Sequence, residues 1–256
     1  MAIITIQYDG KTIVCGDNNS AIPPVQYEVE PLNKKNKVVQ VRNSKIYIPM
    51  YKEDFIQGCV SVGAYYETDF LEETRKYLPT KPVILDIGAN IGNHTLFWAN
   101  ECSAKKIYAF EPVPFIFKIL KKNIKINNLQ ERVKIYNVGL SDKKSAGKIT
   151  SFDRTNIGGT RLEEAKDEDA KDNIKLVTLD SIDFDEKRID LIKIDVEGMD
   201  YLVLTGAIKT IKKYKPLILI ESFPYEYNIS SRILMALGYK IIKDFGSFEY
   251  LYAYEG

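Results

Sequence analysis

Short apolar runs alternate with longer amphipathic segments from residue 83 to residue 237. The apolar runs predict buried strands, and the amphipathic segments predict helices. Strands that alternate with helices in this way form a mostly parallel sheet with helices on both faces. The sequence therefore predicts a Rossmann-like α/β fold. The expected strands are 83–87, 106–110, 133–138, 189–195 and 216–221, and the expected helices are 91–102, 114–127, 198–213 and 228–237.

Hairpin patterns lie at both ends of the chain. Residues 2–15 alternate around an Asp-Gly pair, and residues 38–49 predict a second hairpin that turns at Asn43 and Ser44. We interpret residues 1–50 as a small N-terminal β extension, which either caps the active site or carries the contact of a homo-oligomer. Residues 51–256 then form the main domain, and their last part, 239–254, predicts a terminal antiparallel pair.

Two further segments depart from the α/β alternation. Residues 51–78 are predicted to be mostly helical and lead into the first core strand. Residues 143–175 interrupt the alternation, and the charged piece 163–172 is typical of a solvated loop or helix. The polar piece 156–160 contains two glycines and precedes it. Because long inserted loops often cover a substrate, we predict that 143–175 is a lid.

Composition narrows the class of protein. Lys plus Arg number 36 and Asp plus Glu 35, so the basic excess that a nucleic-acid partner requires is absent. The three cysteines have no paired spacing and there is one histidine, which argues against structural zinc and favours a reducing cytoplasm. The sequence also predicts no signal peptide and no membrane span.

A glycine-rich turn follows the first predicted core strand. The strand carries Asp86, and the turn contains Gly88, Asn90 and Gly92. Gly88 allows close approach of the backbone to a ligand, and the N–H groups of the next helix face it. A dinucleotide fold needs glycine where Asn90 stands. Since an acid before the turn also suits a cationic amino-acid moiety, the turn favours S-adenosylmethionine over NAD.

A second acid ends the next predicted strand. Glu111 follows an apolar run and lies one helix plus one strand beyond Asp86. In a Rossmann-like sheet an acid at this strand tip accepts hydrogen bonds from both ribose hydroxyls. The two acids with the glycine turn between them predict a cofactor site for an adenosine-bearing ligand.

The chain resembles the FkbM-type methyltransferases, which are S-adenosylmethionine-dependent and mostly O-methylating. The first motif alone indicates only a class I methyltransferase, whereas the Ile-Asp-Val-Glu-Gly run at a later strand end narrows the resemblance to this family. The resemblance implies a class I methyltransferase domain over 51–256. The matching stretches are 85–95, 109–112, 137–142, 178–181 and 192–198.

The resemblance also implies further cofactor contacts. Glu67 occupies the position of a family Tyr-Glu pair and is expected to contact the amino end of the cofactor. Asp142 closes the third strand, where adenine often rests in such folds, and Gly139 would bring the backbone close to the adenine ring.

Acids at the last strand ends predict the chemistry. Asp195, Glu197 and Glu221 follow apolar runs, and acids at the tips of buried strands must be hydrogen-bonded or bound to metal. Asp195 is the predicted general base, with His94 as the alternative because its ordinary pKa suits the role. Asp195 and Glu221 are also the predicted ligands of Mg²⁺ or Mn²⁺, which would lower the pKa of a bound hydroxyl.

The predicted reaction is O-methylation of a small molecule. The resemblance implies hydroxyl acceptors on sugars or polyketides, and we favour a sugar or nucleotide-linked sugar of bacterial surface polysaccharide. Three alternatives remain open at this point. They are methylation of a protein or an amine, a non-catalytic protein that binds S-adenosylmethionine, and an NAD enzyme.

Overall fold

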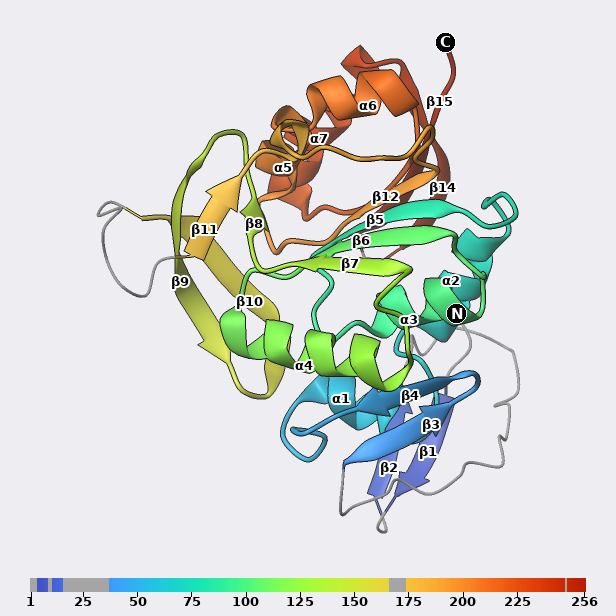
Figure 1. Ribbon diagram of the computed structural model, residues 1–256. Coiled ribbons are helices and arrows are strands. Elements are labelled where there is room, and N and C mark those ends of the chain that lie inside the picture. The colour runs from blue at the N-terminus through green and yellow to red at the C-terminus, as the bar shows by residue number, and fades with distance from the viewer. Residues whose placement is uncertain (1–3, 9–10, 16–36, 166–173, 247) are drawn as a thin grey trace.

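A computed structural model describes residues 4–8, 11–15, 37–165, 174–246 and 248–256 of the chain (Figure 1). A seven-stranded sheet forms its centre, in the order β14-β15-β13-β12-β5-β6-β7. Neighbours from β13 to β7 are parallel, whereas β15 pairs antiparallel with both β13 and β14. The strands are β5 (Val83–Ile87), β6 (Lys106–Phe110), β7 (Val133–Tyr136), β12 (Leu191–Ile194), β13 (Leu217–Glu221), β14 (Tyr239–Gly246) and β15 (Glu249–Tyr254).

Helices cover both faces of this sheet, as predicted (Figure 1). Alternate residues of one strand enter different cores because side chains of a strand point to opposite faces. In β5, Ile84 packs with α3 and α4, whereas Val83 and Leu85 pack with α5, α6 and α7. The helices are α1 (Phe55–Val60), α2 (Thr68–Arg75), α3 (Asn93–Asn100), α4 (Pro114–Ile126), α5 (Asp200–Thr205), α6 (Ile208–Tyr214) and α7 (Pro224–Ala236).

The single helix predicted over 198–213 is wrong, since the chain forms α5 and α6 with a break at Gly206. A Cβ on Gly206 would lie 2.0 Å from the carbonyl oxygen of Ser141. The Asp180 carboxylate accepts hydrogen bonds from the backbone N–H groups of Lys209 and Thr210 and so caps the new helix. The periodicity of the apolar residues continues across the break, which is why the pattern alone suggested one helix.

Both predicted N-terminal hairpins are present, as β1 (Ile4–Tyr8) with β2 (Lys11–Cys15) and β3 (Val38–Val41) with β4 (Ser44–Tyr47). The Asp-Gly turn of the first lies outside the described residues. The second turns at Arg42 and Asn43, one residue earlier than predicted, because Ser44 is buried and hydrogen-bonds to Tyr65 and Asn100.

The second hairpin shares the core beside α3 and α4. Val39, Val41 and Ile46 are fully buried there together with Trp98. The division of the chain at residue 50 remains a prediction.

The segment 143–175 interrupts the alternation as predicted, but its described part is mainly strand. A second sheet has the order β10-β9-β11-β8 and contains β8 (Gly139–Leu140), β9 (Ser145–Asp153), β10 (Asn156–Glu164) and β11 (Ile174–Val177). Glu163 and Glu164 pair with β9, so the start of the charged piece is a strand rather than a loop or helix. Residues 166–172 of that piece lie outside the described residues. A short 3-10 helix, η1 (Leu179–Ser181), follows β11.

Across the described ranges, every helix is too short or too polar to span a lipid bilayer.

Candidate active site

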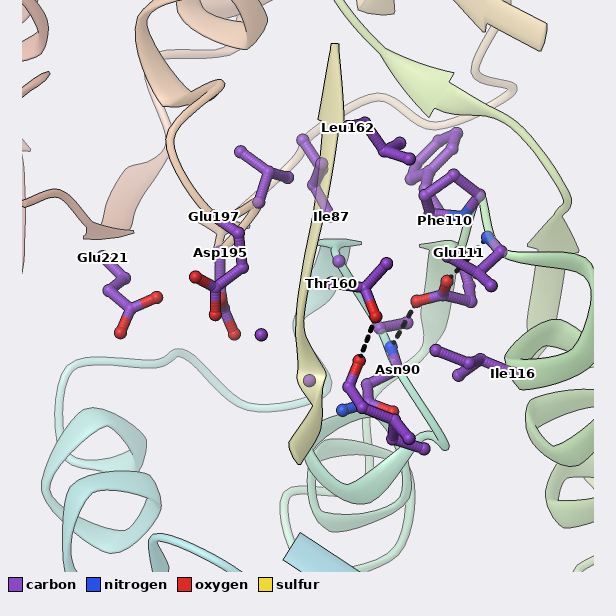
Figure 2. A pocket seen from close by; sticks show the side chains of 18 of the residues that line it. Ile87, Asn90, Phe110, Glu111, Ile116, Thr160, Leu162, Asp195, Glu197 and Glu221 are labelled. Atoms are coloured by element: carbon purple, nitrogen blue, oxygen red, sulfur yellow. Dashed lines mark hydrogen bonds between the residues drawn. The ribbon is translucent and has the colours of Figure 1, made fainter. Parts of the chain in front are cut away.

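A pocket of about 580 Å³ lies at the carboxyl ends of β5, β6, β12 and β13 (Figure 2). This edge is where open α/β sheets bind ligands. Glu111 lines one end of the pocket, and Asp195, Glu197 and Glu221 line the other. With a strand spacing of about 4.8 Å, the three steps from β6 to β13 separate the two ends by about 14 Å. The pocket is therefore long enough for an extended ligand.

The glycine turn forms the floor of the pocket, but its glycines serve the packing of the chain. Gly88 has a φ of +78°, and a Cβ there would lie 1.7 Å from the carbonyl oxygen of Asp195. The close contact with the loop after β12 therefore requires glycine at position 88. The predicted reason, close approach of a ligand, is not the only one. Gly92, with a φ of +92°, leaves room for Leu120 and is not among the residues that line the pocket.

Asn90 and Glu111 join the tips of β5 and β6. Asn90 has a φ of +50°, and its N–H donates to Glu111 Oε2 at 2.9 Å (Figure 2). The N–H of Val113 donates to Glu111 Oε1 at 2.8 Å. Burial raises the pKa of Glu111 to about 7 despite these two hydrogen bonds. The carboxyl is held rigidly at the pocket wall, where a ligand hydroxyl could reach its remaining lone pairs.

Asp86 lies behind the pocket wall rather than in it. Its side chain is 0% exposed and accepts a hydrogen bond from the Thr95 hydroxyl. The Lys193 ammonium lies 3.6 Å from Asp86 Oδ1 and 2.9 Å from Asp195 Oδ2, and it donates to the Gly88 carbonyl at 2.7 Å. Although burial opposes its charge, the two carboxylates raise the pKa of Lys193. Asp86 therefore supports the site through Lys193, and the predicted direct contact with a ligand does not fit its position.

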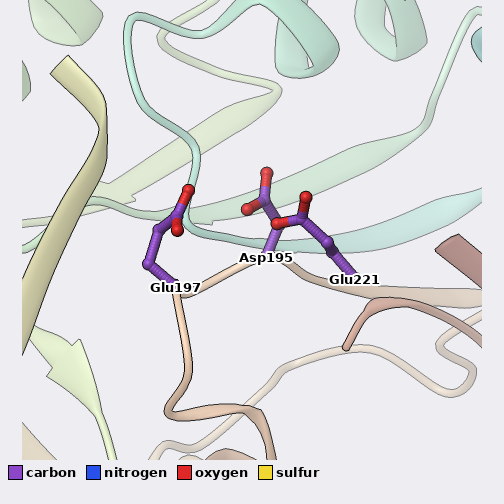
Figure 3. Close-up of side chains that lie close together, drawn as sticks. All are labelled: Asp195, Glu197 and Glu221. Carbon is purple, nitrogen blue, oxygen red and sulfur yellow. The ribbon is translucent and has the colours of Figure 1, made fainter. Parts of the chain in front are cut away.

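Three carboxyl groups converge at the other end of the pocket (Figure 3). Oxygen atoms of Asp195, Glu197 and Glu221 all lie within 4.8 Å of one another. Burial opposes ionisation of Asp195, but the charge of Lys193 and hydrogen bonds from Glu221 and Lys193 together lower the Asp195 pKa. Burial, with Asp195 as the next cause, raises the pKa of Glu197 to about 7 and that of Glu221 to about 10. Such a cluster is suited to hold a proton or a cation.

His94 and Glu67 form the side of the pocket next to the glycine turn. His94 Nε2 lies 3.0 Å from Glu67 Oε2, without the alignment of a hydrogen bond. The imidazole packs between the rings of Phe70 and Trp98. Glu67 has a φ of +59° and precedes α2, so a left-handed turn directs it toward the pocket. Both predicted residues therefore reach the cavity.

Strand β10 covers part of the pocket with its Asn156–Thr160 end. Gly158 packs so closely that a Cβ would lie 2.7 Å from Ile56 Cδ1 and 3.1 Å from Asn90 Nδ2. The Thr160 hydroxyl donates to the Ile157 carbonyl at 2.7 Å (Figure 2). The segment predicted as a lid thus contacts the glycine turn directly.

Asp54 fixes this cover to α1, and Asp54→Ala is expected to loosen it. The 2% exposed carboxylate accepts hydrogen bonds from Ile157 N at 2.9 Å and from Gln57 N at 3.0 Å. Removal leaves two buried N–H groups without an acceptor, so we expect a loss of about 2–4 kcal/mol in the free energy of unfolding. Urea denaturation measures the loss, and amide exchange over β10 should accelerate. Asp183→Ala, at an exposed position, is the control, and unchanged exchange at Ile157 would contradict the prediction.

Sequence reasoning both missed and misplaced residues. Lys193 stands inside an apolar strand, and Glu249 begins β15 after a turn, so no strand-end pattern singled them out, yet both line the pocket. Gly139 also lines it, and its contact with an adenine ring remains a prediction. Asp142 does not, because its exposed side chain lies beyond β8.

Comparison with known proteins places this pocket in a family context. The profile described as Methyltransferase FkbM domain matches residues 86–246. Methyltransferase sdnD of Sordaria araneosa is 29% identical over an alignment 187 positions long, which covers 61% of this chain and 67% of that protein. Methyltransferase 1 of Beauveria bassiana is 25% identical over an alignment 177 positions long, which covers 61% of this chain and 66% of that protein.

A solved structure supports the fold. The crystal structure of Methyltransferase FkbM from Methylobacillus flagellatus matches with a TM-score of 0.50 and 17% identity, over 80% of this chain and 57% of that one. The chain thus spans about two thirds of the length of the curated relatives and somewhat more than half of the solved one.

Proposed function

The chain belongs to the FkbM methyltransferase family, and we propose that it transfers a methyl group from S-adenosylmethionine to a hydroxyl of a sugar. One observation carries the proposal. A single pocket joins the glycine turn and Glu111 at one end with the carboxyl cluster of Asp195, Glu197 and Glu221 at the other. The first end suits an adenosine, and the second suits the activation of a hydroxyl.

The residues at the Glu111 end fit the proposed cofactor. Glu111 already accepts two backbone N–H groups and would accept the ribose hydroxyls with its remaining lone pairs. Asn90 adds a buried side-chain oxygen without a hydrogen bond. Glu67 would face the cationic methionine end, and Gly139 would face the adenine. When bound, S-adenosylmethionine supplies a methyl group on a positively charged sulfur.

Glu111→Ala is expected to weaken binding of S-adenosylmethionine about tenfold or more. Hydrogen bonds to a charged acceptor contribute roughly 1.5–3 kcal/mol, and about 1.4 kcal/mol corresponds to a factor of ten. Isothermal titration calorimetry measures the affinity, with Glu131→Ala at an exposed position as the control. The variant Glu111→Gln, which keeps one acceptor oxygen, should retain part of the affinity. Unchanged affinity in Glu111→Ala would refute the ribose role.

Residues at the carboxyl cluster would hold the acceptor hydroxyl in line with the methyl group. Positioning of this kind can supply a large share of the rate enhancement. Asp195 would accept the hydrogen bond of the hydroxyl and serve as the base. Glu197 is close enough to share the proton, and its raised pKa matches neutral pH better. His94 is the alternative base, since its imidazole lines the same cavity.

A divalent cation is a further part of the proposal. Three carboxyl groups with oxygens within 4.8 Å of one another are a donor set that Mg²⁺ or Mn²⁺ accepts. Asp195 and Glu221 were the predicted ligands, and Glu197 becomes a third candidate ligand because its carboxyl group lies beside theirs. A bound cation would relieve their mutual repulsion and lower the pKa of a hydroxyl. Lys193 already supplies one positive charge beside Asp195, so the site is also balanced in part without metal.

The sugar acceptor is supported by polar side chains that line the pocket, among them Asn156 and Thr160. These amide and hydroxyl groups can hydrogen-bond a hydroxyl-rich molecule. Location in the cytoplasm and a role in polysaccharide synthesis remain proposals that rest on the sequence pattern.

The test is release of S-adenosylhomocysteine from a panel of sugars and nucleotide-linked sugars, each assayed with Mg²⁺ or Mn²⁺ and with EDTA. We expect turnover with at least one sugar. Loss of that turnover in EDTA would support the metal, and its survival would leave a carboxylate or His94 as the base. If S-adenosylmethionine binds but no compound of the panel gives turnover, the proposal of a sugar acceptor is wrong.

A further inference from the structure

Two glutamates stand directly opposite each other at the far end of the pocket. Glu221 ends β13 and Glu249 begins β15, and the two are register partners of this antiparallel pair. Side chains of such partners lie on the same face of the sheet, and both of these line the pocket. Two ionised carboxylates in this arrangement would repel each other, and burial together with the neighbouring acids raises the pKa values of both Glu221 and Glu249. The chain nevertheless carries acids at both positions.

Glu249 is buried without a compensating partner. Its residue is 9% exposed, and within the described parts of the chain no hydrogen bond or ion pair reaches its side chain. Among the described residues, no ion pair joins Glu249 to Lys193 or Arg161, the basic residues that line the pocket, although the charge of Lys193 acts on Glu249 at longer range. Lys193 is held by Asp195, Asp86 and the Gly88 carbonyl. Buried carboxyl groups normally have a partner, so a ligand is the candidate for that role.

The surroundings of Glu249 suit an ammonium group better than a metal ion. Glu249 is not part of the group of carboxyl oxygens that converge within 4.8 Å. Phe223 lines the pocket two residues after Glu221, and its ring packs 5.5 Å from that of Phe248. A carboxylate beside an aromatic ring binds an ammonium through an ion pair and a cation–π contact. A small divalent cation instead requires several converging oxygen atoms.

We propose that the acceptor is an amino sugar, whose protonated amino group binds between Glu249 and Glu221 beside Phe223 while a neighbouring hydroxyl faces Asp195. The inference rests on the proposed function and names the class of its acceptor. Adjacent carbon atoms of a sugar hold an amino group and a hydroxyl close together, which matches neighbouring strand tips about 4.8 Å apart. The excess of acids at this end also disfavours a phosphate in contact with it.

The test measures binding rather than turnover, so that it stands apart from the test of the proposed function. Protein loaded with S-adenosylhomocysteine, in EDTA, is titrated with glucosamine and galactosamine and with their N-acetylated counterparts. Acetylation removes the positive charge and retains the ring hydroxyls. We expect at least one amino sugar to bind about tenfold or more tightly than its N-acetylated counterpart, since a hydrogen bond to a charged group contributes at least this factor to the affinity.

Glu249→Gln is expected to reduce this ratio to near one while leaving the affinity for S-adenosylhomocysteine unchanged. Glu255→Gln is the matched control, because Glu255 follows the same strand but pairs with Lys240 at the exposed surface. Three results would each overturn the inference. They are equal affinities of the wild type for the amino sugar and its N-acetylated counterpart, a ratio of these affinities that is unchanged in Glu249→Gln, and Mn²⁺ binding that requires Glu249. If the protein prefers the amino sugar but no acceptor yields S-adenosylhomocysteine, the proposed methyl transfer is contradicted, whereas the proposed ammonium-binding site at Glu249 is supported.

Discussion

Lys193→Met is expected to lower the free energy of unfolding by about 3–5 kcal/mol, the typical cost of removing one partner from a buried ion pair. Lys193 is 4% exposed, and its ammonium serves Asp86, Asp195 and the Gly88 carbonyl together. Methionine has a similar length but no charge. The substitution leaves the fully buried Asp86 without its cation, and the Thr95 hydroxyl is the hydrogen-bond donor that remains to it.

Equilibrium denaturation in urea measures this loss, and Lys175→Met provides the control. Lys175 also belongs to a strand, β11, but is exposed, so its replacement should change stability by no more than about 0.5 kcal/mol. A double-mutant cycle with Asp86→Asn adds a sharper test. Once Asp86 is neutral, the loss of Lys193 should cost less, and the two changes should be non-additive by 0.5–3 kcal/mol. Strict additivity would mean that Lys193 and Asp86 do not interact as the structure indicates.

The fold was largely predictable because its signals are local. Each parallel strand is a short apolar run buried on both faces, and Gly88 lies where the chain must pass close to Asp195. The order of these runs identifies a Rossmann-like sheet. Strands β9 and β10 were not predicted, because their exposed positions remove the apolar alternation on which a strand prediction depends.

The acids of the site were predictable mainly where a residue follows its strand in sequence. Glu111, Asp195 and Glu221 satisfy that rule and reach the pocket. Glu249 reaches it from the start of an antiparallel strand, so its place depends on the pairing of β13 with β15. Lys193 lies inside an apolar strand, β12, between two other apolar strands. A pattern that predicts a buried strand does not predict an ion pair within it. Asp86 satisfied the motif but is fully buried beside Lys193 and is not among the residues that line the pocket.

Asp195→Asn is expected to reduce kcat by about 10²–10⁴, the usual contribution of a general base, while the affinity for S-adenosylmethionine changes by less than about threefold. Asparagine matches the shape of aspartate but can neither take up a proton nor contribute a negative charge to a cation. Lys193 retains Asp86 and the Gly88 carbonyl as partners, so the fold should persist. Single-turnover release of S-adenosylhomocysteine and calorimetry measure the two quantities, and Asp183→Asn is the exposed control.

Comparison with Glu197→Gln separates the roles of the two neighbouring carboxyl groups. The Lys193 ammonium keeps Asp195 ionised, which weakens it as a base, whereas burial and Asp195 raise the Glu197 pKa to about 7. If Asp195 takes the proton, Glu197→Gln should retain most of the turnover. If Glu197 takes it, Glu197→Gln should lose as much turnover as Asp195→Asn, and the wild-type rate should rise with pH through about 7 as Glu197 ionises. A fully active Asp195→Asn variant would exclude Asp195 from the chemistry under either mechanism.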